Sequence, residues 1–115
     1  MALGELERSV MSVLWGESER TFSVRDVAEY FPDHAYTTIM TVLSRLHDKG
    51  YVVESKSGRA NVYRASTTKE EYVASLMGEA LSQSDDRLVV LSHFAANMDD
   101  DDRAILARLM RRRTQ

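Results

Sequence analysis

The stretch from residue 35 to residue 65 limits the fold of this chain more than any other part of the sequence. Its first half carries apolar side chains at positions i, i+3, i+4 and i+7, namely Ile39, Val42, Leu43 and Leu46. This spacing predicts an amphipathic helix that begins near Tyr36 and buries one face. The opposite face carries short polar side chains, Thr37, Thr41, Ser44 and Asp48. Such a face suits a helix in the DNA major groove, where hydroxyls reach base edges or phosphates and Arg45 binds the two acceptors of guanine.

A glycine and a β-hairpin are predicted to follow this helix. Gly50 provides the left-handed position at which helices commonly end. Residues 51–55 and 60–64 are rich in Val and Tyr and flank a turn at residues 56–59, which indicates two antiparallel strands. Because an isolated hairpin is marginally stable, this one must pack against the helices. We interpret it as the wing of a winged helix-turn-helix. It carries three basic side chains, Lys56, Arg59 and Arg64.

Two further helices are predicted upstream. The first covers residues 5–15, is stopped by Gly16 and is followed by a polar connection. The second covers residues 24–31, begins after the N-cap residue Ser23 and is ended by Pro32. A tight turn then leads into the amphipathic helix. Two short helices joined by such a turn are typical of the helix-turn-helix motif.

Residues 66–115 are predicted to be entirely helical. A capping box at Thr67–Glu70 opens one helix, a second begins at Ser84 or Asp85, and a third begins at Asp99. The second helix is apolar on nearly every side, so other apolar surfaces must pack around it on every side. About fifty residues in three helices cannot bury that much apolar surface alone. The expected cover is the same segment of a second chain in a two-fold symmetric homodimer. The residues predicted at the dimer contact are Tyr72, Leu76, Leu88, Leu91, Phe94, Ile105, Leu106 and Leu109.

Composition and charge exclude several classes of protein. The net charge is −3, yet residues 35–65 carry five basic side chains against two acidic ones, so positive charge is concentrated on the helix and wing. The chain has no cysteine, which excludes disulfides, thiolate metal sites and thiol redox chemistry. It shows neither a membrane-spanning apolar run nor a signal-peptide pattern. We therefore expect a cytoplasmic protein without a membrane partner.

No arrangement of residues is typical of catalysis or of metal or cofactor binding. The histidines His34, His47 and His93 lack metal-ligand spacing. The acidic run 99–102 and the basic run 111–113 lie at the two ends of one predicted helix, where they complement its macrodipole. We therefore expect no enzyme activity, no metal and no cofactor. The expected ligand is double-stranded DNA.

The residues predicted to contact DNA lie on the amphipathic helix and on the wing: Tyr36, Thr37, Thr38, Met40, Thr41, Arg45, Lys56, Arg59 and Arg64. The alternative for the helix is a polar face that merely meets solvent, but three Thr in five residues lower helix stability without a structural return. Tyr36 and Met40 have a further alternative, which is packing in the core. The alternative for the wing cations is surface charge that serves solubility.

The predicted fold class is mainly α with a small β-hairpin. Residues 1–65 form a winged-helix DNA-binding domain, and residues 66–115 form a three-helix dimerisation region. The predicted function is DNA binding by a dimer at a palindromic site. Two other functions remain open. One is a protein–protein interaction module that uses Tyr36, Met40 and Tyr63 as an apolar patch. The other is a repressor gated by a small ligand.

Several motifs resemble those of the penicillinase-repressor family (BlaI/MecI type). They are Leu3–Glu7, Val13–Trp15, Ser23–Val27, Tyr36–Leu43, Arg45-Leu46, Lys49-Gly50, Gly58-Arg59, Tyr63 and Glu70–Tyr72. The resemblance covers essentially the whole chain. It implies a homodimeric repressor that binds a short palindromic operator and controls β-lactam resistance (β-lactamase) genes. In one branch of the family a membrane sensor-protease cuts the repressor before a Phe, usually after Asn. The pair at the matching place here is His93-Phe94.

Overall fold

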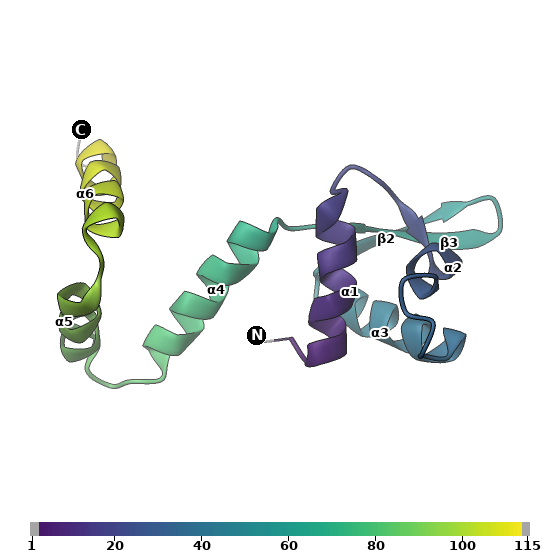
Figure 1. Ribbon diagram of the computed structural model, residues 1–115, viewed down its shortest axis with the longest axis horizontal. Helices are drawn as coiled ribbons and strands as arrows, with labels where there is room; N and C mark the ends of the chain where they lie inside the picture. Colours follow the sequence, from purple (N-terminus) through teal and green to yellow (C-terminus); the bar gives the residue numbers. More distant parts are fainter. Residues whose placement is uncertain (1–2, 114–115) are drawn as a thin grey trace. The chain divides into compact units, whose positions relative to one another are not determined.

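The computed structural model describes residues 3–113, and the chain divides into two compact units, Met1–Leu76 and Met77–Gln115. The first unit contains three helices, a small sheet and the beginning of a fourth helix (Figure 1). Its elements are α1 (Glu5–Gly16), β1 (Phe22–Ser23), α2 (Val24–Ala28), α3 (Tyr36–Asp48), β2 (Val52–Ser57), β3 (Ala60–Ala65) and the first half of α4 (Lys69–Ser82). The predicted class, mainly helical with a small β element after a helix-turn-helix, is confirmed.

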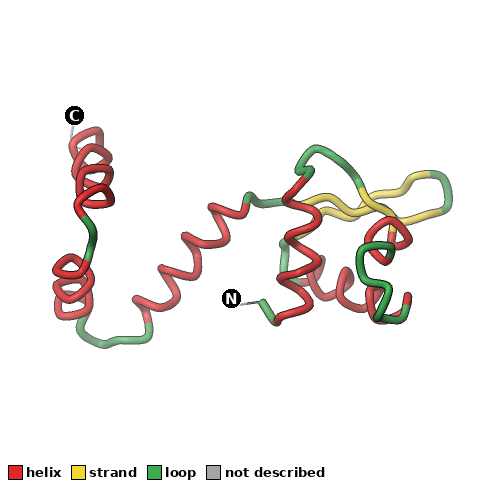
Figure 2. The backbone as a smooth tube through the Cα atoms, viewed as in Figure 1, coloured by secondary structure: helices red, strands yellow, loops and turns green. Residues whose placement is uncertain are grey.

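The sheet has three antiparallel strands rather than the two that were predicted. β2 and β3 form the hairpin, and β1 pairs with the other edge of β3, which gives the order β1-β3-β2 (Figure 2). In this register Phe22 lies opposite Tyr63. The side chain of Phe22, at the end of the polar connection after α1, is fully buried. A strand of two residues has no alternation to detect, and its partner lies far along the chain.

The core of the first unit draws on α1, α2, α3 and the sheet. Its largest fully buried side chains are Phe22, Met11, Leu14, Ile39, Leu43, Leu46, Val10 and Val27. All four apolar residues predicted on the inner face of α3 are buried. No polar or charged residue is buried among residues 3–113. Burial of apolar area is therefore the main force that holds α3 in place.

The C-terminus of α3 ends as predicted, at Gly50. This residue has φ +84°, a left-handed conformation that L side chains rarely adopt. The Gly50 amide donates to the carbonyl of His47 at 3.0 Å, and the Tyr51 amide donates to the carbonyl of Leu46 at 2.9 Å. This pair of hydrogen bonds is the Schellman motif. It turns the chain directly from α3 into β2.

The hairpin turn is shorter than predicted. The strands continue to Ser57 and resume at Ala60, so that only Gly58 and Arg59 connect them. Gly58 has φ +64° and Arg59 has a negative φ, which is the pattern of a type II′ turn. The longer strands project Arg59 at the tip of the wing.

Two helix ends differ from the prediction. Gly16 is the last residue of α1, and the cap that follows is Glu17 with φ −140°, so Gly16 does not provide a left-handed stop. α2 ends at Ala28 instead of Phe31. Because Phe31 precedes Pro32, the helical conformation is disfavoured there, and the chain leaves the helix early.

The capping box of α4 lies one residue later than predicted. Thr68 Oγ1 accepts a hydrogen bond from the Glu71 amide, and Glu71 Oε1 accepts one from the Thr68 amide, both at 3.0 Å. Thr67 instead offers its carbonyl to Trp15 Nε1 at 2.9 Å, and its own hydroxyl is buried without a partner. The indole of Trp15 thus fixes the residue before the helix and shifts the cap from Thr67 to Thr68.

The first half of α4 packs into the core of the first unit. The hydroxyl of Tyr72 accepts a hydrogen bond from the amide of Leu3 at 3.0 Å, and its ring lies 5.5 Å from that of Trp15 and 5.6 Å from that of Tyr51. Leu76 packs against the same core. The division between compact units therefore falls after Leu76, inside α4, and later than the predicted boundary between residues 65 and 66.

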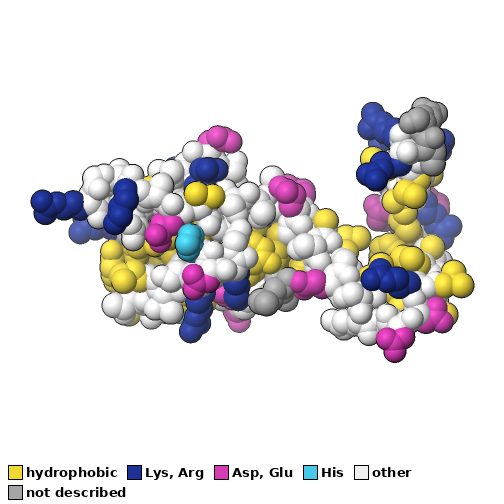
Figure 3. All heavy atoms as spheres, turned by 180° about the vertical axis from the view of Figure 1, so that it is seen from behind, with side chains coloured by type: hydrophobic (Ala, Val, Ile, Leu, Met, Phe, Trp, Pro, Cys, Tyr) yellow, Lys and Arg dark blue, Asp and Glu magenta, His cyan; other side chains and the backbone are white. Residues whose placement is uncertain are grey.

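The second unit consists of the end of α4, α5 (Arg87–Asn97) and α6 (Asp100–Arg113). α5 begins later than predicted, with Asp86 as its cap, and α6 begins after Asp99 as predicted. None of the described residues of this unit is buried. Hydrophobic side chains are visible over α5 and α6 (Figure 3). Within residues 3–113, no helix has the length and apolar character needed to cross a membrane.

Candidate nucleic-acid interface

The outer face of α3 is polar and open to solvent. The six residues of α3 predicted to contact DNA are all exposed: Tyr36, Thr37, Thr38, Met40, Thr41 and Arg45. Tyr36 is 52% exposed and Met40 46% exposed, so neither packs in the core. Thr41 Oγ1 donates to the carbonyl of Thr37 at 3.0 Å and keeps its lone pairs available as acceptors. The face therefore combines hydroxyls, one guanidinium and two larger apolar groups.

An ion pair between α1 and the end of α3 holds this helix in position. Lys49 Nζ lies 2.9 Å from Glu7 Oε2 and 3.0 Å from Glu7 Oε1. The Glu7 side chain is only 12% exposed and also accepts a hydrogen bond from the amide of Gly4 at 3.0 Å. Burial raises the pKa of Glu7, but the hydrogen bonds from Lys49 and Gly4 and the charges of Lys49 and Arg45 outweigh it and lower the pKa below its ordinary value.

Replacing Lys49 with Met should lower the free energy of unfolding at pH 7 by about 1 kcal/mol. Because the folded state lowers the pKa of Glu7, its ionised form stabilises the fold above the ordinary carboxyl pKa, and this contribution is lost as the pH falls through the folded pKa. The difference between wild type and variant should therefore shrink at pH 3.5. Urea unfolding at both pH values, followed by the fluorescence of Trp15, the single tryptophan, measures this.

Lys56→Met is the matched control, because Lys56 is exposed and has no ion pair within the described residues. It should leave the unfolding curve nearly unchanged at both pH values. An equal loss of stability at pH 7 and pH 3.5 in Lys49→Met would contradict the ion pair as its cause and assign the loss to packing of the lysine stem.

A groove of about 600 Å³ separates α3 from the wing. Tyr36, Met40 and Ser44 line it from α3. The wing contributes Glu54, Ala60, Asn61 and Tyr63. The end of β1 contributes Ser23, and the beginning of α2 contributes Val24 and Arg25. Two of the predicted contact residues, Tyr36 and Met40, thus face the same space as the inner side of the hairpin.

Burial, followed by a hydrogen bond to the Glu54 carboxylate, raises the pKa of Tyr63 to about 12. Glu54 and Tyr63 lie directly opposite each other in the hairpin. The phenol therefore stays protonated at neutral pH and donates to Glu54. A carboxylate in the groove accepts hydrogen bonds and repels phosphate, so this part of the surface suits the amino group of a base better than a phosphate.

The three basic residues of the wing do not form one cluster. Alternation along the strands places Lys56 on the same face as Glu54 and Tyr63, which is the face toward α3, and places Arg64 on the opposite face. Arg59 lies at the turn. All three are exposed, and basic side chains are visible around the hairpin in Figure 3. Their contacts with phosphates stay predictions, and Arg64 requires a phosphate on the far side of the wing.

A second hollow, of about 440 Å³, lies on the other side of α3 toward the beginning of α1. Thr38, Thr41 and Arg45 line it from α3, facing Glu5 and Glu7. The predicted contact residues of α3 are therefore divided between the two sides of one exposed ridge. The carboxylates of Glu5 and Glu7 also place negative charge near the guanidinium of Arg45.

Six of the residues predicted at the dimer contact are open to solvent in the single chain. Leu88 is 76% exposed, and the others, Leu91, Phe94, Ile105, Leu106 and Leu109, lie between 44% and 52%. Tyr72 and Leu76 differ, because they pack in the first unit. The six exposed residues are the ones that a partner chain is able to cover.

The pair His93-Phe94 lies in the middle of α5. The carbonyl of His93, which belongs to the peptide bond between the two residues, accepts a hydrogen bond from Asn97 Nδ2 at 2.9 Å. Cleavage at this bond would require α5 to unwind, and it stays a prediction. No group of His, Asp and Glu within residues 3–113 has the arrangement of a metal site.

A sequence model of the penicillinase repressor family matches residues 3–112. The chain belongs to this family. It is 40% identical over 114 residues to the transcriptional regulator BlaI of Mycobacterium tuberculosis, both in strain CDC 1551 / Oshkosh and in strain H37Rv, and the match covers 94% of this chain and 82% of each relative. These relatives are transcriptional regulators and not enzymes. This member of the penicillinase repressor family is therefore a transcriptional regulator. Its expected DNA-binding elements are α3 and the wing.

Two solved structures resemble the fold of this penicillinase repressor family member. A MarR family protein from Bacillus stearothermophilus has a TM-score of 0.53 at 14% identity and covers 100% of this chain and 75% of its own. The PcaV transcriptional regulator from Streptomyces coelicolor has a TM-score of 0.52 at 23% identity, with 97% and 74% covered. At these identities the likeness supports the winged-helix fold alone.

Among the residues that line the groove between α3 and the wing, the sequence prediction missed Arg25, Glu54 and Asn61, which carry a charge or an amide. Arg25 carries the only extra positive charge among them and follows the N-cap residue Ser23 by two positions. The first helix of a helix-turn-helix crosses the DNA backbone. A basic residue at the start of that helix is therefore a candidate for a phosphate contact, and this reasoning could have identified Arg25 from the sequence. No sequence signal distinguished Glu54 and Asn61 from other polar residues of a hairpin.

Proposed function

We propose that this penicillinase repressor family member is a homodimeric repressor that binds a palindromic DNA operator and controls β-lactam resistance genes. The observation that carries this proposal is the division of α3. The four apolar residues of its inner face are buried, whereas every predicted contact residue on the helix is exposed beside a projecting wing. A helix so divided presents hydroxyls and Arg45 to the major groove, with the wing at the flanking backbone.

The apolar surface of the second unit supports the dimer. α5 and α6 contain no buried residue, although α5 reads LVVLSHFAA over most of its length. Exposed apolar surface of this kind in a soluble chain marks an association site. A two-fold dimer doubles the DNA-binding unit, so the two α3 helices would read half-sites about one helical turn apart, and the operator would be a palindrome.

The proposed target genes follow from the family. The family is named penicillinase repressor, and its relatives in Mycobacterium tuberculosis are named transcriptional regulator BlaI. The direct experiment is a footprint of the purified protein on the DNA upstream of its own gene and of neighbouring β-lactamase genes. A protected palindrome supports the proposal. Uniform weak protection along the DNA would contradict sequence-specific binding.

Replacing Arg45 with Ala should weaken operator binding by about 1–3 kcal/mol and relax the sequence preference, because the guanidinium is expected to read a base. Replacing Lys56 with Ala should weaken all DNA sequences alike and reduce the dependence of log Kd on log salt by about one unit, because the ammonium is expected to contact a phosphate. Fluorescence anisotropy titrations with operator and scrambled DNA at several salt concentrations measure both effects.

Ser18→Ala is a control for these titrations, because Ser18 is exposed and lies outside α3 and the wing. Unchanged operator affinity in both Arg45→Ala and Lys56→Ala would overturn the assigned orientation of α3 and the wing. The salt dependence also separates the proposal from a protein–protein interaction module. An apolar interface built on Tyr36, Met40 and Tyr63 would lose little affinity with added salt.

A further inference from the structure

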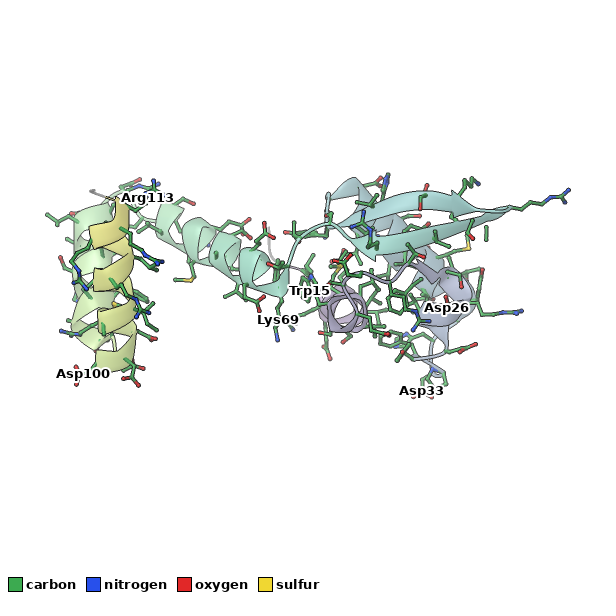
Figure 4. All side chains as sticks on the ribbon, turned by 90° about the horizontal axis from the view of Figure 1, so that it is seen from above. Trp15, Asp26, Asp33, Lys69, Asp100 and Arg113 are labelled. Carbon is green, nitrogen blue, oxygen red and sulfur yellow. The ribbon has the colours of Figure 1, made fainter. Side chains whose placement is uncertain are left out.

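A single carboxylate, that of Glu54, lines the groove between α3 and the wing. Glu54 lies directly opposite Tyr63 in the pairing of β2 with β3. Alternation along the strands gives both residues the face toward α3, and Figure 4 shows side chains on both faces of the hairpin. Tyr63 is only 3% exposed, whereas Glu54 is open to solvent. The carboxylate is therefore accessible from the groove and rests on a buried ring.

A chain of hydrogen bonds holds this carboxylate in place. Asn61 donates to the hydroxyl oxygen of Tyr63, and the hydroxyl of Tyr63 donates to Glu54. Asn61 and Tyr63 are two residues apart in β3 and so share one face of the strand. A carboxylate accepts several hydrogen bonds, so Glu54 keeps acceptor positions for a ligand after it has accepted from Tyr63.

The charge of Glu54 is not compensated by an ion pair. Among residues 3–113, no basic side chain forms a salt bridge with Glu54, although Lys56 lies on the same face of β2 and Arg25 lines the same groove. A free carboxylate repels phosphates and other acceptors and attracts N–H donors. The groove therefore favours a ligand that offers an amino group.

The four bases of DNA differ in how their major-groove edges meet such an acceptor. Guanine presents two acceptors and thymine presents O4, and a carboxylate repels both bases. Adenine presents an amino group beside the acceptor N7. Cytosine presents its amino group without a neighbouring acceptor on the same base. Cytosine is thus the base that a carboxylate suits best.

We propose that Glu54 is a specificity-determining residue that accepts a hydrogen bond from the amino group of one cytosine in each half-site, with Tyr63 as its positioning residue. The inference rests on the proposed operator binding and assigns to the wing a part in reading the sequence. DNA that contacts both α3 and the wing passes over the groove between them. Tyr36 and Met40 line the α3 side of that groove and offer apolar contact to the pyrimidine ring.

A purely structural role for the pair of Glu54 and Tyr63 explains less. A hydrogen bond between opposite residues stabilises a hairpin, but a glutamine at position 54 would accept the same hydrogen bond from Tyr63. It would do so without the negative charge, which opposes binding of the DNA backbone. Recognition of an amino group gives the charge itself a function.

Glu54→Gln tests this inference in the full-length protein. Anisotropy titrations measure the affinity for the footprinted palindrome and for every single-base change made in both half-sites together. At one position per half-site, the wild type should prefer cytosine about tenfold over the other bases. The variant should shift the preference at that position alone toward adenine, because glutamine pairs with N6 and N7 of adenine. Glu19→Gln is the matched control, since it removes an exposed carboxylate outside α3 and the wing and should leave all preferences unchanged.

Tyr63→Phe tests the positioning role separately. The substitution keeps the buried ring and removes the hydroxyl, so it should reduce the preference for cytosine at the same position about threefold. Preferences at the other positions should stay the same. Urea unfolding followed by Trp15 fluorescence determines the folded fraction used to correct the affinities. Equal weakening on every sequence would show that Tyr63 acts on stability alone and would overturn its assigned role.

Two results for Glu54→Gln would overturn the proposed reading of cytosine. One is a set of base preferences identical to that of the wild type. The other is a uniform change of affinity on all sequences, which would reduce Glu54 to a general electrostatic effect on the DNA backbone. Sequence-specific binding by the wild type would leave the proposed function standing in both cases. A wild type without a base preference at any position would overturn the proposed function and this inference together.

Discussion

Replacing Leu91 and Phe94 together with Glu should convert the protein into a monomer and reduce operator affinity by roughly 100-fold or more. Both residues line an apolar groove of about 340 Å³ between the end of α4 and α5, and both are about half exposed in the single chain. Burying a carboxylate in a dimer contact is strongly unfavourable unless it is paired. Loss of the second DNA-binding unit removes the gain in effective concentration, which is about 100-fold to 10,000-fold for linked sites.

The first unit should keep its structure in this double variant, because no residue of α5 belongs to its core. Sedimentation reports the mass, anisotropy reports the operator affinity, and Trp15 fluorescence reports the state of the first unit. Ser18→Glu with Gln83→Glu is a control that adds the same charge at two exposed positions without removing apolar surface. A double variant that stays dimeric would exclude the apolar groove between α4 and α5 as the dimer contact.

The course of α3 was predictable because its signals are local. Ile39, Val42, Leu43 and Leu46 define the buried face at helical spacing, and Gly50 provides the one conformation that the following turn requires. Each of these signals depends on neighbours within one or two turns. The exposure of the contact residues on the outer face followed from the same periodicity, and it was the part of the candidate site that the sequence predicted best.

The features that escaped prediction depend on contacts between distant parts of the chain. β1 exists because Phe22 pairs with Tyr63, and no local pattern marks a strand of two residues. The cap of α4 lies at Thr68 because Trp15 binds the carbonyl of Thr67. Tyr72 is a further example of a residue whose contacts are distant in sequence. Helical spacing placed it on the apolar face of its helix but did not reveal that its neighbours are in the first unit.

The groove beside α3 was unpredictable for a related reason. It arises where Arg25, Tyr36 and Tyr63 come together from α2, α3 and β3. Only the folded hairpin brings Glu54 opposite Tyr63 and fixes that carboxylate on the side toward α3. Sequence spacing predicted which elements form the exposed candidate interface, whereas the chemistry between those elements depends on tertiary packing.

Replacing Phe22 with Ala should lower the free energy of unfolding of the first unit by about 3–5 kcal/mol. Phe22 is a fully buried side chain at the centre of the core, and the guanidinium of Arg20 lies 4.3 Å from the centre of its ring. Truncation removes its transfer free energy and leaves a cavity that the backbone pairing of β1 with β3 prevents from closing. Because a small domain has a total stability of about 5–15 kcal/mol, this loss would populate the unfolded state at physiological temperature.

Urea unfolding followed by Trp15 fluorescence measures this loss, and operator binding at 10 °C and 37 °C measures its consequence. Affinity should approach that of the wild type at the lower temperature, because Phe22 is buried away from the outer face of α3, and should fall at the higher one as the fraction of folded protein decreases. Arg20→Ala is the control, since it removes only the cation above the ring and should cost about 1 kcal/mol. A loss below about 1 kcal/mol in Phe22→Ala would mean that β1 does not anchor the wing. The position of the hairpin relative to α3 would then depend on the Gly50 turn and on the core side chains Val52, Tyr63 and Ala65.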